Sequence, residues 1–361
     1  MADQEPIAPA PSTDRRAFLT TGAALAAGGL MFGEWTPASA AALPKRKLGR
    51  TGLMVTTLSF GGIQLSDDSH KRVLEHAIDA GINLIHSCPG YTGGRSMKVV
   101  GDVMKTKRKS VYLAIKASPG DVDRCLQTLN TDVIDILIPD SADFSDKEKE
   151  AYAKLQKAGK IRFSGFACHN GMAKRLEAAI DAGWRDVMLI SYNAGNRGGL
   201  DDVIAKAVKA QKMGFMAMKV RAGGDFGAGL RSLLKNDDIH TLTPGMNSVQ
   251  QIDANIAAVT QRNADTRRED REFARYCSTL AGKLCTHCGH CDQACPQRVA
   301  IGEYLRADLY RERGDLRLAQ DLVRSIPRRQ SVAACTRCGR CDHACERQLS
   351  VMDLIHDVAR V

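Results

Sequence analysis

Aromatic residues are scarce in this sequence. Phe, Trp and Tyr together make up 5% of the 361 residues, although the formal net charge is +10. Surfaces that bind single-stranded nucleic acid combine positive charge with aromatic side chains on which bases stack. The sequence therefore has the positive charge of such a surface but few of the aromatic side chains, and we expect no nucleic-acid partner.

Two further features are missing. Beyond residue 40 the sequence contains no run of the roughly 20 apolar residues that a membrane-spanning helix needs. No G-x-G-x-x-G motif follows the first expected strand, which argues against an open dinucleotide-binding sheet. The 44% of hydrophobic residues nevertheless suffices for a large globular core.

Cysteine is abundant, and eight of the 12 cysteines form two runs of the pattern C-x2-C-x2-C-x3-C. This is the ligand spacing of proteins that hold two 4Fe-4S clusters, in which the fourth cysteine of each run serves the other cluster. Zinc sites and disulfide frameworks are the alternatives, but neither fits two identical runs of this spacing well. One expected ligand set is Cys285, Cys288, Cys291 and Cys345, and the other is Cys335, Cys338, Cys341 and Cys295. The first run ends in Cys295-Pro296, whereas the second ends in Cys345-Glu346.

The clusters also change the charge balance. Residues 262–361 contain 18 Lys and Arg against 14 Asp and Glu. Two oxidised clusters with their thiolates would add about −4 and offset this excess of positive charge. The arginine pairs Arg328-Arg329 and Arg337/Arg340 could attract an acidic redox partner, or they could simply form a solvated surface.

The N-terminal segment has the pattern of an export signal. Twin arginines precede Phe-Leu in residues 14–19, a short Ala/Gly-rich apolar run continues to about Phe32, and Ala38-Ser39-Ala40 follows. This order is typical of a twin-arginine signal peptide with cleavage after Ala40. We therefore expect a periplasmic or otherwise exported protein that leaves through the twin-arginine machinery, already folded around its cofactors.

Between these ends the sequence alternates short apolar runs with amphipathic segments, which predicts parallel βαβ units. Eight such repeats predict a closed (β/α)8 barrel of the TIM type, with a doubly wound open sheet as the alternative. The expected domains are a signal at 1–40, a barrel at 45–262 and a small, mostly helical ferredoxin-like domain at 270–361. The expected strands are 55–58, 82–85, 111–115, 133–138, 161–167, 187–190, 214–218 and 240–243. The expected helices are 71–80, 97–106, 122–129, 147–158, 172–182, 200–212, 227–234 and 249–259.

Several short motifs occur in order along this expected barrel. They are Lys47–Leu53, Gly81–Asn83, Tyr91, Ala114–Lys116, Asp135–Ile138, Gly159–Phe166, Met216–Lys219 and Pro244–Met246. From about residue 45 onward the sequence resembles the aldo-keto reductases, and specifically the branch with a ferredoxin-like C-terminal extension. The resemblance implies carbonyl or alcohol chemistry at the carboxyl ends of the barrel strands.

In that family a Tyr protonates the substrate oxygen, a Lys paired with an Asp lowers the pKa of the Tyr, and a His orients the substrate. Tyr91 and Lys116 match the first two positions. His86 stands where the family has Asp, and Asp140 stands where it has His, so these two residue types are exchanged. Because Lys116 ends the third strand, Asp140 after the fourth could still supply its carboxylate. The alternative is an inactive site in which Lys116 is a structural ion pair and Tyr91 a packed aromatic.

The match is poorer where the family holds a nicotinamide nucleotide. Its amide-binding Ser, Asn and Gln correspond to Ala167, Cys168 and Leu189. Its phosphate-binding Arg and its Glu correspond to Gln251 and Ala254, which leaves Asn255, and Gln cannot replace the charge of a guanidinium.

Two residues after the seventh strand, Lys219 and Arg221, could still hold an anion, with Gly223 and Gly224 in the same turn. A glycine-rich turn with solvated charges is the alternative there. Cys168 and His169, at the end of the fifth strand, could contact substrate, although two ligands are too few for a typical metal site.

Three functions remain open from the sequence. The first is an exported iron-sulfur oxidoreductase whose barrel exchanges electrons with a redox partner protein through two 4Fe-4S clusters and acts on a small-molecule substrate. The second is a ferredoxin-type electron carrier with a catalytically inactive barrel. The third is an ordinary NAD(P)H-dependent carbonyl reductase, for which the nucleotide-binding positions are a poor match.

Overall fold

The structure is a computed structural model that describes residues 42–361 except 141–142, 221–225, 262, 281–283 and 313. The expected signal peptide at 1–40 lies outside the described residues, and so does Arg221. No helix in the described part of the chain combines the length and apolar character needed to cross a membrane.

Eight parallel strands form the barrel, and each strand pairs with its neighbours in sequence order. They are β3 (Phe60–Gly61), β4 (Leu84–Ser87), β5 (Tyr112–Ile115), β6 (Ile134–Leu137), β7 (Ile161–Cys168), β8 (Val187–Ser191), β9 (Gly214–Met218) and β10 (Thr241–Thr243). The expected barrel architecture is thus confirmed. The strands consist largely of apolar residues, which is typical of parallel strands that are covered on both faces.

The expected first strand at 55–58 is wrong. Its first half belongs to β2 (Met54–Thr56), which pairs antiparallel with β1 (Lys45–Lys47). The first barrel strand is the two-residue β3, and isolated bridges from Leu58 to Leu242 and from Gly61 to Gly245 bring the first and last strands together. The barrel is therefore nearly closed, and its seam is short because Ser59, Gly61 and their partners contribute few ladder hydrogen bonds.

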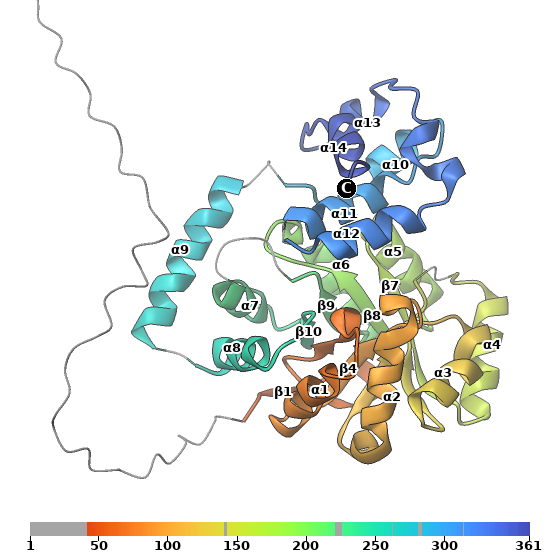
Figure 1. The fold of residues 1–361 in the computed structure, drawn as a ribbon, viewed down its shortest axis with the longest axis vertical. Helices are drawn as coiled ribbons and strands as arrows, with labels where there is room; N and C mark the ends of the chain where they lie inside the picture. Colours follow the sequence, from red (N-terminus) through yellow and green to blue (C-terminus); the bar gives the residue numbers. More distant parts are fainter. Residues whose placement is uncertain (1–41, 141–142, 221–225, 262, 281–283, 313) are drawn as a thin grey trace, which may run out of the picture. The chain divides into compact units, whose positions relative to one another are not determined.

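Eight helices alternate with these strands and surround them (Figure 1). They are α1 (His70–Asp79), α2 (Arg95–Lys107), α3 (Val122–Leu129), α4 (Asp146–Lys157), α5 (Met172–Ala182), α6 (Asp201–Gln211), α7 (Phe226–Leu234) and α8 (Val249–Thr260). Side-chain caps fix two of their starts, because Ser145 accepts from the Glu148 N–H and Ser248 from the Gln251 N–H, each at 3.3 Å.

Two apolar clusters stabilise the barrel. The larger lies between the strands and the surrounding helices and includes Phe60, Phe166 and Phe215. The smaller consists mainly of strand residues, among them Leu84, Ile136 and Leu189, with Leu48 and Leu53 from the N-terminal segment. Ile136 and Ile138 lie in the smaller cluster while Leu137 between them lies in the larger, as expected for strands that bury both faces.

The C-terminal region after the barrel is helical. Its elements are α9 (Ala264–Leu280), α10 (His290–Ala294), α11 (Ile301–Glu312), α12 (Leu316–Ser325), α13 (Arg340–His343) and α14 (Val351–Val358), with the 3-10 turns η7 (Arg328–Gln330) and η8 (Val332–Ala334). A third apolar cluster includes Tyr304, Leu305 and Ile355 together with Cys291 and Cys341. The cysteine runs are therefore part of the core of this region.

Candidate functional site

The expected catalytic residues gather at the carboxyl ends of neighbouring barrel strands. His86 lies in β4, Lys116 directly follows β5, Asp140 follows β6, and His169 directly follows β7. Parallel strands end at the same rim of a barrel, which is where enzymes of this architecture carry out their chemistry. Tyr91 lies in the 3-10 turn η3 (Tyr91–Gly94) just after β4.

Lys116 is the centre of this group. Its side chain is only 5% exposed, and its Nζ lies 2.7 Å from Asp140 Oδ1. The same Nζ lies 3.2 Å from Nε2 of His169, whose ring is 3.8 Å from Asp140 Oδ1. The contact between Lys116 and Asp140 that the sequence predicts is therefore present, and its catalytic role stays a prediction.

The contact with Lys116 determines the proton position on His169. An ammonium group can only donate hydrogen bonds, so Nε2 of His169 accepts and the proton of the neutral ring lies on Nδ1. Burial and the neighbouring charges, Lys116 first among them, hold the pKa of His169 well below its usual value. Nδ1 is buried, and no described residue accepts its proton. His169 thus presents an unused donor in the site.

Asp140 stays ionised beside this lysine. Partial burial raises the pKa of Asp140, but the ammonium of Lys116 and the guanidinium of Arg306 more than offset this effect, and the net pKa is lowered. Arg306 lies in α11, so a side chain of the C-terminal region contributes to the electrostatics of the barrel site.

Tyr91 and His86 lie next to each other. Their rings meet edge to face at 5.8 Å between centroids, and Lys116 Nζ lies 5.8 Å from the centre of the Tyr91 ring. Burial raises the pKa of Tyr91 well above its usual value and lowers that of His86 to about 3. The resemblance implies a Tyr whose pKa is lowered by a neighbouring Lys. In the structure the pKa of Tyr91 is raised instead, because burial is the largest influence on it. Tyr91 is therefore a protonated phenol, and His86 is a neutral imidazole with a buried Nε2 that has no partner among the described residues.

A cavity of about 650 Å³ opens beside these residues. His86 and Tyr91 line one part of it, Gln251 and Asn255 from α8 line another, and Tyr310 comes from α11. The two described residues that were expected to bind an anion, Asn255 and Lys219, have different contacts. Asn255 is buried and lines the cavity, whereas Lys219 donates to the hydroxyl of Tyr310 and lies 4.1 Å from the centre of its ring.

The charges that line this cavity do not favour a pyrophosphate. Arg231 is already paired with Glu269 at 2.9 Å and with Asp270 at 2.7 Å. Three carboxylates line the cavity, those of Asp265, Glu269 and Asp315. At the positions where the family grips the nicotinamide amide, Ala167, Cys168 and Leu189 are buried and offer at most a thiol. The described residues therefore fit a nicotinamide dinucleotide poorly.

The two cysteine runs surround two small cavities in the C-terminal region. Cys285, Cys288, Cys291 and Cys345 line the first, which we call the first cluster site. Cys295, Cys335, Cys338 and Cys341 line the second, which we call the second cluster site. Each site takes three sulfurs from one run and the last sulfur from the other, as the crossing pattern predicts.

The chemistry of these donors fits iron-sulfur ligation. Burial raises the pKa of Cys285 and of Cys341 to about 11 and that of Cys291 further, so these thiols need a strong cationic partner to ionise. Iron prefers soft thiolate ligands and would supply the positive charge. Its binding would release the thiol protons. The four sulfurs of each site would hold one 4Fe-4S cluster.

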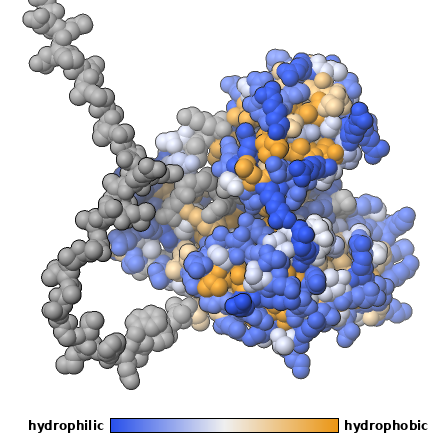
Figure 2. Space-filling model, in the orientation of Figure 1, coloured by the Kyte–Doolittle hydropathy of each residue, from blue (hydrophilic) through white to orange (hydrophobic). Residues whose placement is uncertain are grey.

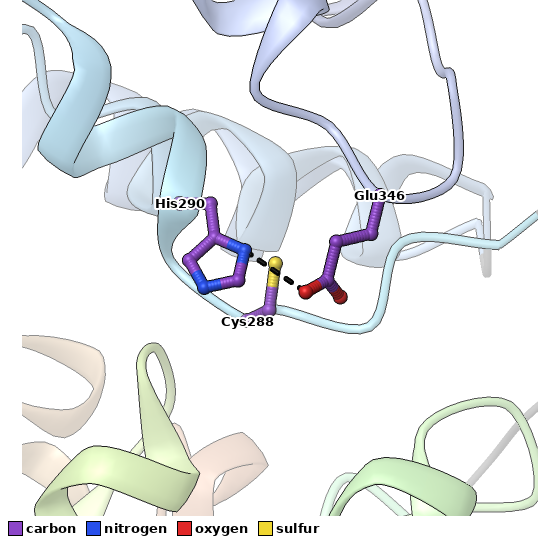
Figure 3. A group of neighbouring side chains, drawn as sticks. All are labelled: Cys288, His290 and Glu346. Atoms are coloured by element: carbon purple, nitrogen blue, oxygen red, sulfur yellow. Dashed lines mark ion pairs between the residues drawn. The ribbon is translucent and has the colours of Figure 1, made fainter.

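A smaller group at the first cluster site contains Cys288, His290 and Glu346, whose ligand atoms lie within 4.8 Å of one another (Figure 3). His290 Nδ1 and Glu346 Oε1 form an ion pair at 3.1 Å, with both side chains about half exposed. Because Cys288 already lines the first cluster site, this group belongs to that site. Glu346 directly follows the last cysteine of the second run, where the first run has Pro296. Its ion pair with His290 connects the end of the second run to α10.

The first cluster site packs directly against the barrel. The backbone N–H of Gly171, in the loop after β7, donates to the carbonyl of His287 at 3.0 Å, and Asn170 Oδ1 lies 3.1 Å from His287 Nδ1. Asn170 itself lines the first cluster site. No barrel residue is among the described residues that line the second cluster site. A short chain of residues therefore joins the first site to His169 and Lys116.

Some residues of the site were not expected from the sequence. Arg306 and Tyr310 lie in a helix far along the chain from the barrel motifs, and no local pattern marks them as facing the barrel. His169 was expected to contact substrate or a metal and not to pair with Lys116, although its position directly after a strand was the available signal for that contact.

Comparison with known proteins agrees with this architecture. The sequence matches the aldo/keto reductase family over residues 53–224 and the 4Fe-4S dicluster domain over residues 281–349. Among curated proteins, an uncharacterized oxidoreductase of Bacillus subtilis, YqkF, is 30% identical over 147 residues, which cover 34% of this chain and 48% of the relative. L-galactose dehydrogenase of Arabidopsis thaliana is 24% identical, with 60% of this chain and 88% of that protein covered.

Solved structures share the fold. An aldo-keto reductase of Bacillus halodurans superimposes with a TM-score of 0.56 at 19% identity, covering 64% of this chain and 96% of that one. An aldo-keto reductase of Klebsiella pneumoniae, solved with NADPH, gives a TM-score of 0.51 at 18% identity over 64% and 95% of the two chains. At these identities the likeness concerns the fold alone. The chain therefore combines a barrel that is similar to the aldo/keto reductase family over residues 53–224 with a C-terminal segment that matches the 4Fe-4S dicluster domain over residues 281–349.

Proposed function

We propose that the protein is an exported oxidoreductase that interconverts a small carbonyl compound and its alcohol, with electrons exchanged through the C-terminal region instead of with free NAD(P)H. One observation carries the proposal. The first cluster site contacts the loop after β7, and His169 in that loop contacts Lys116 in the barrel site. Electrons and protons would thus meet at one rim of the barrel.

The barrel residues would handle the protons and orient the substrate. When bound, the two clusters would each supply one-electron transfer, so that together they match a two-electron conversion. Tyr91 is a protonated phenol beside the cavity and would donate a proton to the substrate oxygen. The unpartnered ring nitrogens of His86 and His169 would hold polar atoms of the substrate, while Asp140 fixes Lys116.

The poor fit for a dinucleotide supports the same proposal. Lys219 and Arg231, the cations among the described residues that line the cavity, already have partners in Tyr310 and in two carboxylates. A phosphate would have to displace those partners and then lie beside Asp265 and Asp315. The twin-arginine pattern at 1–40 points to export, and free nicotinamide nucleotides are not expected outside the cytoplasm.

The substitution Tyr91→Phe tests the function. With reduced methyl viologen as the electron donor and a panel of small aldehydes, ketones and oxo acids as substrates, we expect kcat to fall by at least about 100-fold. Iron content and the cluster absorbance should not change. Tyr276→Phe, at an exposed tyrosine on α9, is the matched control and should keep full activity.

Three outcomes separate the candidate functions. Loss of turnover in Tyr91→Phe with intact clusters supports a working barrel site. Full iron content without turnover of any substrate by the native protein contradicts the proposal and favours an electron carrier with an inactive barrel. Tight binding of NADH or NADPH, measured by calorimetry, contradicts electron supply through the clusters and favours an NAD(P)H-dependent carbonyl reductase.

A further inference from the structure

The residues around the second run of cysteines include four exposed arginines. We define the basic face as Arg328 and Arg329, which lie in η7, with Arg337 and Arg340, which flank Cys338. All four arginines are exposed, and among the described residues none of them forms an ion pair with a carboxylate. Four exposed and unpaired guanidinium groups in one short stretch carry a large local positive potential.

The acidic residues of the same stretch do not cancel this charge. Residues 324–347 contain six arginines against Asp342 and Glu346, a formal excess of +4. Asp342 accepts from the backbone N–H of Met352 at 2.9 Å, and Glu346 is paired with His290. A bound cluster with its thiolates would subtract about 2 from this count, so the stretch would stay positive.

The second cluster site also reaches the solvent. Cys338 is exposed, whereas the other cysteines of both sites are buried or partly buried. The first cluster site, by contrast, contacts the barrel through Asn170 and His287. One site therefore faces the barrel chemistry, and the other lies at a charged surface.

The visible surface of the C-terminal region combines apolar and hydrophilic side chains. Figure 2 shows apolar side chains gathered on the visible face of the C-terminal region and bordered by hydrophilic ones. Protein interfaces commonly combine an apolar centre with a polar rim, and charge complementarity at the rim accelerates association.

We propose that the basic face is the docking surface for an acidic one-electron redox protein, which exchanges electrons with this chain at the second cluster site. The proposal rests on the proposed function, because it assigns the source of the electrons. In each encounter the partner gives up one electron and this chain gains it. Two encounters and two protons balance the reduction of one carbonyl to one alcohol, and the reverse direction balances equally.

Two variants test the basic face independently. The first is Arg328→Glu/Arg329→Glu, which lies outside the cysteine loops, and the second is Arg337→Gln/Arg340→Gln, which removes the charge and keeps polar side chains. Lys154→Glu/Lys157→Glu, at two exposed lysines on α4, is the control with the same charge change as the first variant. The probe is an acidic plant-type 2Fe-2S ferredoxin.

Binding of the oxidised ferredoxin is measured by calorimetry, and its oxidation after reduction is measured by stopped flow, both at low ionic strength. We expect the affinity and the second-order rate of the first variant to fall by at least about tenfold, the second variant to lose less, and the control to keep the native values. Raising the salt concentration should slow the native protein towards the rate of the variants.

The failure of this proposal is distinguishable from failure of the proposed function. Turnover driven by reduced methyl viologen needs no protein interface and should be native in both variants. If that turnover is absent from the native protein, the function is wrong. If it is present while ferredoxin fails to bind the native protein, or binds both variants with native affinity, the docking surface is wrong.

Discussion

Lys116 lies between a carboxylate and an imidazole at the rim of the barrel. The lysine has a carboxylate partner in Asp140 on the strand after its own, and an imidazole partner in His169 one strand further. A buried ammonium needs such partners, because burial without them costs several kcal/mol. The position where the family has its aspartate is occupied by His86, which the Lys116 charge helps to keep neutral.

The buried imidazole of His86 makes stability depend on pH. Its pKa is lowered from 6.5 to about 3, so between these values the unfolded chain binds a proton that the folded chain does not. Stability is therefore complete above pH 6.5 and falls by roughly 1.4 kcal/mol per pH unit as the pH drops below it. His86→Gln should lose less stability than the native protein between pH 7.5 and pH 5.5.

Urea unfolding midpoints at the two pH values measure this difference. His76→Gln is the control, because His76 is partly exposed and lies in a surface ion pair with Asp253. The control should follow the native pH dependence. Equal pH dependence in His86→Gln and the native protein would show that His86 is not held neutral by the fold.

The sequence predicts the contact between Lys116 and Asp140 for a physical reason. Neighbouring parallel strands place the residues after their ends side by side, so a lysine and a carboxylate there meet. The same reasoning cannot find Arg306 or Tyr310. Their approach to the barrel depends on how α11 packs, which is a tertiary contact with no local sequence pattern.

At the level of elements, two glycines occupy equivalent positions in the cysteine loops. Gly289 and Gly339 each precede the third cysteine of a run by two residues and have φ angles of +85° and +72°. A side chain at Gly339 would meet nothing within 4 Å, whereas one at Gly289 would lie 3.1 Å from the backbone nitrogen of Gly171. Of the two loops, as far as the structure describes the chain, the one around Gly289 packs against the barrel at this position.

The substitutions Gly289→Ala and Gly339→Ala separate backbone strain from this contact. Both variants should lose about 1 kcal/mol from the left-handed conformation, since alanine avoids it. Gly289→Ala should lose more, and it alone should slow turnover with methyl viologen, because the loop must move away from Gly171. Thermal unfolding and the turnover rate provide the two measurements. Equal losses in both variants would indicate that the contact with Gly171 is unimportant.

The elements themselves were largely predictable. The expected helices 122–129 and 172–182 and the expected strand 214–218 have the observed bounds. The first strand was mistaken because the apolar run Val55–Leu58 has the composition of a barrel strand. The run instead divides at Thr57, whose N–H donates to the Pro44 carbonyl, and such a long-range pairing leaves no trace in the local pattern.

At the level of the whole molecule, the cysteines of the C-terminal region also contribute to its fold. Cys291 and Cys341 are members of its apolar core, and each cluster site joins residues from both cysteine runs. The free energy of metal binding is then also free energy of folding. The barrel has its own large core and does not share this dependence.

Removal of iron with a chelator under reducing conditions should therefore unfold the C-terminal region alone. We expect amide hydrogen exchange to accelerate across residues 285–361, while strands β4 to β9 keep their protection. Restoring iron and sulfide should reverse the change. Unchanged protection of α11 and α14 after complete removal of iron would contradict a folding role for the clusters.

Under the proposed function, the backbone hydrogen bond from Gly171 to His287 has a kinetic consequence. A separate carrier would have to diffuse to the barrel for every electron, and its delivery would depend on concentration. A carrier that is part of the same chain and held by this bond meets the barrel at an effective concentration on the order of millimolar or above. Internal delivery should therefore be independent of dilution, and only the encounter with the external partner should remain second order.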